Sequence, residues 1–213
     1  MRDHGVREHE RQRGQGLVEF TLVLPIILVL VLSVAELGLI FGKLSSLGYG
    51  TREGARTGSA LAQGYIDDCI ADPGNNKVDA VLVAAVQRIL KSPDAGIDLR
   101  KVQEIRIFKA SSPSGAETPG RVNIWTYAGP GMGPEVDPGP GAAYLDFVPG
   151  MVGWPACDRL DGTPVGPIDS IGVTIKYTYD FVTPFPSVVN AIFGGNLSPT
   201  LTETTVMAVN PTY

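Results

Sequence analysis

The first residue of the sequence that suggests a chemical role is a glutamate inside an apolar run. Glu19 follows the basic stretch RQRG (11–14) and lies in the first turn of a long apolar run, with Phe20 directly after it. A buried carboxylate is costly unless a cation or hydrogen-bond donors neutralise it. Glu19 therefore predicts a contact that brings a positive group to this position. The alternative is a carboxylate that only reaches back to water at the end of the run.

A second glutamate lies near the other end of the same run. Glu36 is followed, further along the chain, by Arg52 and Arg56, which are one helical turn apart. Two interpretations stay open for this set. Glu36 either marks the outer boundary of the apolar segment or meets an arginine such as Arg52 or Arg56 of a packed neighbour.

Residue types that support catalysis are sparse. The only histidines, His4 and His9, precede the apolar run, so the rest of the chain has no histidine base for a Ser-His-Asp or Cys-His arrangement. Asp158 and Asp161 could in principle act as an acid–base pair, but they lie in the turn-like segment CDRLDGTP. Phosphate-loop and dinucleotide fingerprints are absent from the sequence. We expect no enzymatic activity and no cofactor.

The two cysteines are candidates for a disulfide, and the cysteines and the acidic loop are candidates for metal binding. Asp67, Asp68 and Asp72 lack the ligand spacing of a calcium loop, and no CxxC or Cys/His cluster is present. Cys69 and Cys157 permit one disulfide in an oxidising compartment, with two free thiols as the alternative. Closing this long loop would contribute about 3–5 kcal/mol in the chain-entropy model. We expect no metal site.

The apolar run predicts a membrane-spanning helix over 15–42. From Leu17 to Phe41 its only ionisable residues are the two glutamates, and such a helix spans the roughly 30 Å hydrocarbon core. A cleaved secretory signal is disfavoured because the small-residue triplet at 60–62 lies far beyond the run. The arginine-rich leader, 1–14, favours a cytoplasmic N-terminus, with the remainder outside the cytoplasm. The net charge of −5 and the lack of a basic stripe argue against nucleic-acid binding.

Periodicity predicts an α+β head behind this helix. We expect the leader to be flexible, Pro25 to loosen the helix locally, and an extension over 43–64 whose glycines allow close approach of other helices. The head, 65–213, should follow in this order: a loop over 65–76, an amphipathic helix over 77–91, strands over 102–110 and 121–128, a Gly/Pro-rich excursion over about 129–167, a strand over 172–181, a short apolar helix over 183–195 and a strand over 200–209. Helix and antiparallel sheet would pack together, with the strand aromatics Trp125, Tyr177 and Tyr179 in the core.

The N-terminal string carries a resemblance to a known family. If a peptidase cuts after Gly14, the mature chain starts at Gln15 and Glu19 becomes its fifth residue, which is the pattern of type IV pilins. The string GQGLVEFTLVLPIILVLVLSVAELG (14–38) resembles the TadE-like family of pseudopilins from tight-adherence (Flp-type) pilus systems. TREGARTGSA (51–60) is similar to the segment that follows the membrane helix in that family.

The resemblance implies a structural subunit. It would be inserted in the cytoplasmic membrane with its N-terminus inside, cleaved by a prepilin peptidase, and assembled with other pilin subunits at an inner-membrane platform. Glu19 would then pair with the N-terminal amine of a neighbouring subunit. The size of the head disfavours a bulk filament subunit. The alternative function is a permanently anchored single-pass protein whose extracytoplasmic head binds a ligand or partner.

Overall fold

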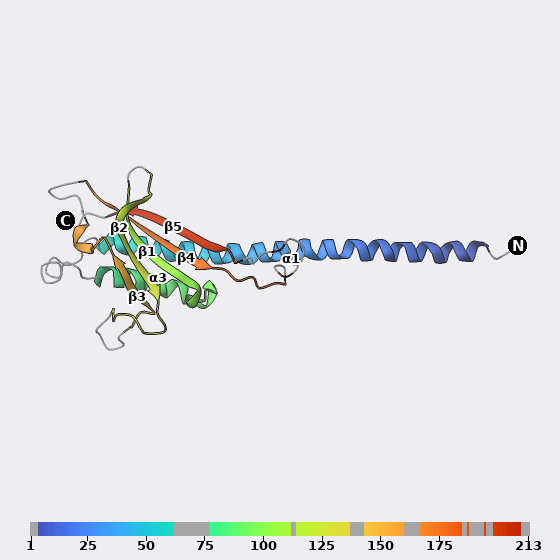
Figure 1. Ribbon diagram of the computed structural model, residues 1–213, viewed down its shortest axis with the longest axis horizontal. Coiled ribbons are helices and arrows are strands. Elements are labelled where there is room, and N and C mark those ends of the chain that lie inside the picture. The colour runs from blue at the N-terminus through green and yellow to red at the C-terminus, as the bar shows by residue number, and fades with distance from the viewer. Residues whose placement is uncertain are drawn as a thin grey trace. The chain divides into compact units, whose positions relative to one another are not determined.

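A computed structural model describes most of the chain and divides it into two compact units (Figure 1). The described residues are 4–61, 77–111, 114–136, 143–159, 167–184, 187, 194 and 198–209, with side chains described from Gly16 onward. The first unit, called here the helix unit, comprises Met1–Ile40 and Asp180–Ser198. The second comprises Phe41–Tyr179 and Pro199–Tyr213, and the name head refers to these residues from here on instead of to 65–213.

Helix α1 runs from His4 to Leu61 and contains Pro25 without ending there. Residues 4–14 of the leader are helical, a conformation that the sequence analysis did not predict for them. Arginine, glutamate and glutamine dominate this stretch and are good helix formers, so the absence of apolar periodicity did not imply the absence of a helix. The predicted end of the helix near Gly64 lies outside the described residues.

From Leu17 to Ile40, α1 is apolar on all sides apart from Glu19, Thr21, Ser33 and Glu36. Among the described residues, α1 is the one helix with the length and composition to cross a membrane. Its large exposed side chains include Leu17, Phe20, Leu30 and Val34. A helix that is apolar all round requires an apolar environment of lipid or other helices.

The head contains a five-stranded antiparallel sheet in the order β3-β2-β1-β4-β5. The strands are β1 (Val102–Ala110), β2 (Glu117–Tyr127), β3 (Phe147–Val152), β4 (Ser170–Thr178) and β5 (Thr200–Ala208). In the centre of the sheet, Ile105 of β1 lies opposite Trp125 of β2 and Ile175 of β4. The predicted α+β fold is confirmed.

The Gly/Pro-rich excursion, which was expected to be a loop, contains strand β3. Residues 147–152 pair with β2, although the sequence analysis assigned no strand to this region. Pro149 and Gly150 argued against a strand, but β3 is an edge strand, where a proline need not donate to a neighbour. Strand β2 likewise begins at Glu117, earlier than expected, and includes Pro119 and Gly120.

Helix α3 (Lys77–Leu90) buries the predicted apolar face, including Val78, Leu82 and Val86. Short 3₁₀ helices lie at Pro93–Ala95, Leu99–Lys101 and Ala156–Asp158. The aromatic prediction is confirmed, since Trp125, Tyr177 and Tyr179 are buried. The predicted loop over 65–76 and most of the predicted short helix over 183–195 lie outside the described residues.

Glycines let α1 approach α3 and the sheet at the same time. A Cβ added to Gly54 would lie 2.7 Å from Val86 Cγ2 on α3 and 3.4 Å from Val173 Cγ1 on β4. At Gly58 the added atom would lie 2.6 Å from Ile171 Cδ1. These contacts confirm that glycines of the extension permit close packing, and they place the end of α1 against both α3 and β4.

Candidate functional site

The segment predicted for processing and assembly lies on α1. Gly14 and Gln15 have helical backbone, and Glu19 and Phe20 are exposed, Phe20 by 61%. The hydroxyl of Thr21 donates to the carbonyl oxygens of its own helix at 2.9 and 3.0 Å, so the helix itself satisfies this polar group. The exposed Glu19 side chain thus lies at the start of the apolar surface.

Glu36 has partners that neither interpretation of the sequence anticipated. Its side chain is buried, with 2% exposed, and its carboxylate accepts hydrogen bonds from the backbone N–H groups of Val182 at 3.1 Å and Thr183 at 3.0 Å. All three residues belong to the helix unit. The carboxylate thus binds a distant turn of its own chain, and an arginine contact between subunits stays a prediction.

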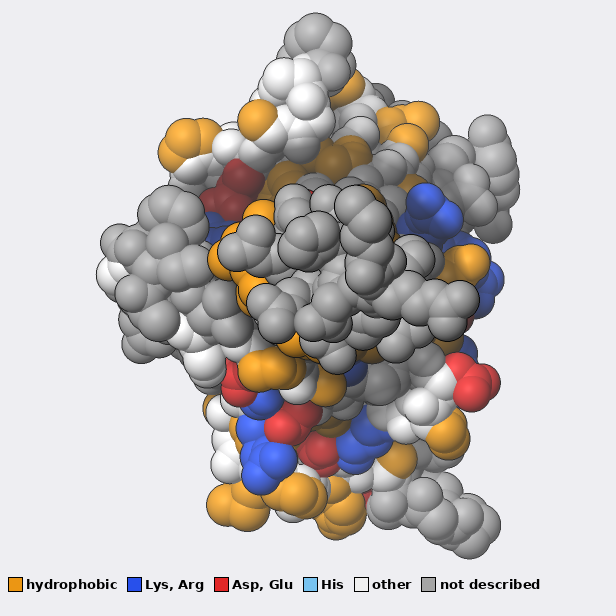
Figure 2. Space-filling model, turned by 90° about the vertical axis from the view of Figure 1, so that its right-hand side faces the viewer, with side chains coloured by type: hydrophobic (Ala, Val, Ile, Leu, Met, Phe, Trp, Pro, Cys, Tyr) orange, Lys and Arg blue, Asp and Glu red, His pale blue; other side chains and the backbone are white. Residues whose placement is uncertain are grey.

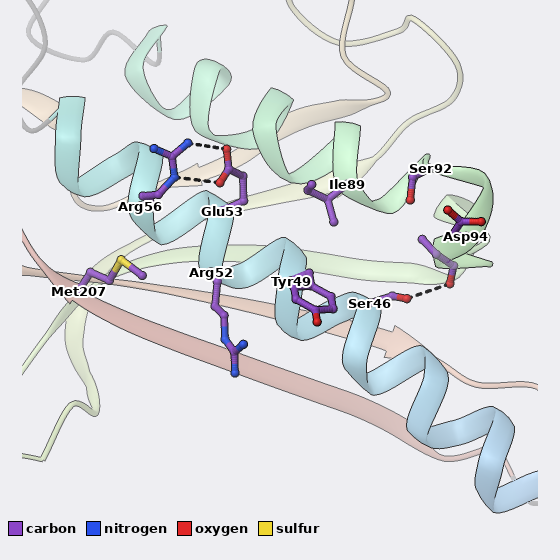
Figure 3. Close-up of a pocket in the computed structure, with 10 residues that line it drawn as sticks. Ser46, Tyr49, Arg52, Glu53, Arg56, Ile89, Ser92, Asp94 and Met207 are labelled. Carbon is purple, nitrogen blue, oxygen red and sulfur yellow. Dashed lines mark hydrogen bonds and ion pairs between the residues drawn. The ribbon is translucent and has the colours of Figure 1, made fainter.

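Arg52 and Arg56 lie on the part of α1 that belongs to the head, and they differ in their partners (Figure 3). Arg56 donates to both carboxylate oxygens of Glu53 at 2.8 and 2.9 Å, and Arg88 of α3 reaches the same carboxylate at 3.3 Å. The hydrogen bond from Arg56 holds the pKa of Glu53 below its ordinary value, although partial burial opposes this shift. Arg52 points away from the Glu53–Arg56 pair, and within the described part of the chain it has no hydrogen-bond or ion-pair partner.

A groove of about 480 Å³ follows this face of α1. Figure 3 shows Tyr49 and Arg52 of α1 between Ile89 of α3 and Met207 of β5. Tyr49 is 61% exposed. An exposed ring beside an exposed guanidinium suits a contact with another protein surface, since aromatic and arginine side chains are enriched there.

The sequence analysis missed a buried polar cluster in the head. Asp79 of α3 is 1% exposed. Its carboxylate accepts a hydrogen bond from Asn123 Nδ2 at 2.6 Å and forms an ion pair with the buried Arg159. Asn123 also binds the backbone of Trp154, and the Arg159 guanidinium lies 4.9 Å from the centroid of the Trp154 ring. A charged residue on the buried face of an amphipathic helix was the available signal, because Asp79 precedes Leu82 by one turn.

The remaining candidate residues show no converging chemistry. Asp158 pairs with Arg121 at 2.9 Å on the surface, and Asp161 lies outside the described residues. Cys157 is disulfide-bonded, while Cys69, the other cysteine, lies outside the described residues, so the pairing of the two stays a prediction. Within the residues whose placement is described, no three His, Cys, Asp or Glu side chains are grouped to hold a metal ion.

Charges of both signs are mixed on the surface. In the face drawn in Figure 2, basic side chains lie beside acidic ones. Ion pairs in the head follow the same pattern, with Arg106 bound to Glu117 and Lys176 bound to Glu104, each at 2.7 Å. A one-sign surface is typical of nucleic-acid binding, and the absence of such binding stays a prediction from the sequence.

Comparison with known proteins adds one match. A family model described as TadE-like protein matches residues 14–56. The matched segment begins at Gly14 and includes both glutamates of the apolar run and both arginines, and it confirms the resemblance drawn from the sequence. No curated protein and no solved structure matches the chain.

Proposed function

We propose that this chain, TadE-like over residues 14–56, is a pseudopilin-like structural subunit of a tight-adherence (Flp-type) pilus or a related secretion filament. The family suggests involvement in Tad/Flp pilus assembly. The observation that carries the finer proposal is α1 itself. An exposed apolar helix with Glu19 five residues after Gly14 continues to Leu61 in the head.

Membrane insertion precedes assembly in this proposal. The apolar part of α1 spans the cytoplasmic membrane, with the arginine-rich leader inside and the head outside. The exposed apolar surface supports this placement, since those side chains are stable in lipid and, after assembly, between neighbouring helices. Partners are therefore the prepilin peptidase, other pilin-like subunits and the inner-membrane assembly platform.

Cleavage after Gly14 frees an α-amine at Gln15, a cation that can pair with a carboxylate. The new α-amine at Gln15 of one subunit meets the Glu19 carboxylate of a neighbour. Pairing offsets the cost of removing both charges from water, and it occurs only when the two helices are aligned so that these residues face each other. The contact fixes the axial alignment of neighbouring helices while subunits leave the bilayer. The proposed role is structural, and no enzymatic reaction is assigned to the head.

Intact mass of the membrane-extracted chain tests the processing step. In cells with an active prepilin peptidase, we expect the mass of a chain that begins at Gln15, and in cells without it a chain that begins at Met1. Gly14→Leu should block cleavage, while Gly16→Ala, a glycine substitution on the other side of the bond with open space around it, should not. A chain that keeps Met1 in the presence of the peptidase would contradict the proposal.

A permanently anchored protein with a binding head is the second candidate. The groove that contains Tyr49 and Arg52 favours it, because the groove offers an exposed aromatic ring and a cation to a ligand or partner. The mass measurement separates the two functions. The anchor keeps residues 1–14 in every background, whereas the pseudopilin loses them.

A further inference from the structure

The turn bound by Glu36 lies beside a helix that is apolar all round. Glu36 accepts the backbone N–H groups of Val182 and Thr183, while the Val182 side chain points outward and is 71% exposed. The turn and this part of α1 belong to the same compact unit. An exposed valine is thus fixed beside an exposed apolar helix.

The position of Glu36 along α1 gives the depth of this turn. From Leu17 to Glu36 the helix rises about 28 Å at 1.5 Å per residue, close to the roughly 30 Å of a hydrocarbon core. Apolar side chains continue beyond Glu36 to Phe41, which is 67% exposed. Glu36 therefore lies within the outer end of the apolar band, and the turn that it binds lies at the same level.

The hydrogen bonds explain how irregular backbone is tolerated at that level. Backbone N–H groups near hydrocarbon need partners inside the protein, and a carboxylate there needs donors. The contact of Glu36 with Val182 and Thr183 satisfies both needs inside a buried site. The valine side chain, which needs no polar partner, is left outside.

The sequence around the turn has the composition of a membrane contact. No charged residue occurs from Phe181 to Thr202, and Asp180 and Glu203 flank this stretch. Within the described part of the turn, Phe181 is half-buried and Pro184 is exposed. The turn Phe181–Pro184 itself carries no charge, and a neutral turn at the level of the outer leaflet fits a lipid surface better than water.

We propose that the turn Phe181–Pro184 is a second membrane contact, in which Val182 inserts into the outer leaflet beside α1 while Glu36 binds the turn's backbone. The partner is the boundary between acyl chains and headgroups. This inference rests on the membrane insertion of α1 in the proposed function. It adds a contact with the bilayer surface to the one made by α1.

Spin-label accessibility on the full-length chain tests the inference. Val182→Cys carries the label, Leu30→Cys reports on the middle of the apolar helix, and Val206→Cys provides an exposed valine on β5 of the head. Each variant is reconstituted into vesicles of phosphatidylethanolamine and phosphatidylglycerol, with the wild-type chain as labelling blank. The ratio of collision rates with oxygen and with a water-soluble nickel chelate is measured. We expect the ratio at Val182 to approach that at Leu30 and to exceed that at Val206 several-fold.

The outcomes separate this inference from the proposed function. If Val182 matches Val206 while Leu30 is in lipid, the second contact is overturned and membrane insertion stands. If Leu30 is also in water, both are overturned. Spin–spin broadening at Val182 in vesicles, abolished by dilution with unlabelled chain, would assign the turn to a second copy and overturn the lipid contact.

A substitution at Glu36 tests the proposed anchor of the turn. Glu36→Ala removes both acceptors, so the label at Val182 should become more mobile and lose its oxygen preference, while the label at Leu30 keeps its own. Glu36→Gln keeps one carbonyl oxygen and should retain part of the effect. An unchanged label at Val182 in Glu36→Ala would overturn the role of Glu36.

Discussion

At the scale of single residues, two carboxylates on one helix have different environments. Glu19 is exposed at the start of the apolar surface, whereas Glu36 is buried and bound by backbone donors of its own chain. A carboxylate already satisfied within the chain gains little from a partner subunit. The exposure of Glu19 at the start of the apolar surface makes it the better candidate for a contact between subunits, and the burial of Glu36 makes it the better candidate for a contact within one.

Glu19→Ala should leave membrane insertion intact and impair filament assembly. Loss of a buried ion pair costs roughly 3–5 kcal/mol, so the yield of sheared filaments should fall by at least about tenfold. Thr21→Ala is the matched control, because its hydroxyl bonds only its own helix. Filament yield and the amount in the membrane fraction are measured by immunoblot. Normal piliation in Glu19→Ala would contradict a role of Glu19 in the contact between subunits.

Asp79→Ala should destabilise the head because it removes the carboxylate that binds Arg159 and Asn123. Breaking a buried pair on one side costs about 3–5 kcal/mol. Asp158→Ala breaks a surface pair with Arg121 and should cost at most about 1 kcal/mol. Denaturant unfolding of the full-length chain in detergent, followed by tryptophan fluorescence, gives both values. Similar losses in the two variants would contradict a special role for Asp79.

At the scale of elements, the glycines of α1 decide how the helix joins the head. Gly54 and Gly58 face α3 and β4 without room for a side chain, whereas Gly48 has open space around it. The same residue type therefore has opposite consequences at positions two turns apart. A glycine at a packing face allows close contact, and a glycine elsewhere only lowers helix propensity.

Gly54→Ala should lower the thermal midpoint of the head, while Gly48→Ala should raise it. The new methyl at position 54 would meet Val86, and overpacking of this kind costs about 1–3 kcal/mol. The methyl at position 48 meets nothing, so the helix gains up to about 1 kcal/mol in propensity. Circular dichroism melting in detergent gives both shifts. Equal shifts would contradict the close packing of α1 on α3.

At the scale of the whole molecule, the two units place different demands on their surroundings. The helix unit exposes apolar surface and needs lipid or neighbouring helices, while the head has a packed core and a surface of mixed charge. Carboxylates paired with basic residues in the head couple its stability to pH.

The head should lose stability in acid. Burial raises the pKa of Glu104, but the hydrogen bond from Lys176 and the charge of Arg106 outweigh it and hold the pKa below the ordinary value of 4.5. A lowered folded pKa means that the stabilisation is present above pH 4.5 and is lost as the pH falls through the folded value. The pKa of Asp98 is lowered by its hydrogen bond with Arg100 and acts in the same direction.

Melting of the full-length chain between about pH 3 and pH 7 measures this dependence. Glu104→Gln should flatten the acid limb of the profile, since the amide cannot titrate. Glu135→Gln, on an exposed side chain outside this ion-pair network, is the control and should leave the limb unchanged. An acid limb that is the same in wild type and Glu104→Gln would contradict the assignment.

Local pattern in the sequence was sufficient for the apolar helix, the amphipathic helix Lys77–Leu90, most strands and the family resemblance over 14–56. These features depend on residues close together in the chain, so periodicity and a short motif reveal them. Strand β3 was missed because its proline and glycine are acceptable only at a sheet edge, and the strand order is a property of the whole fold.

The tertiary structure alone decided which polar groups meet. Glu36 binds the turn at Val182 and Thr183, and Asp79 binds Arg159, across sequence separations that no local pattern spans. A carboxylate in an apolar segment indicates that a partner is needed, but the tertiary fold determines which group becomes that partner. The sequence by itself thus placed two carboxylates in an apolar run and left their partners open, and the fold decided that Glu36 is bound by backbone donors of its own chain.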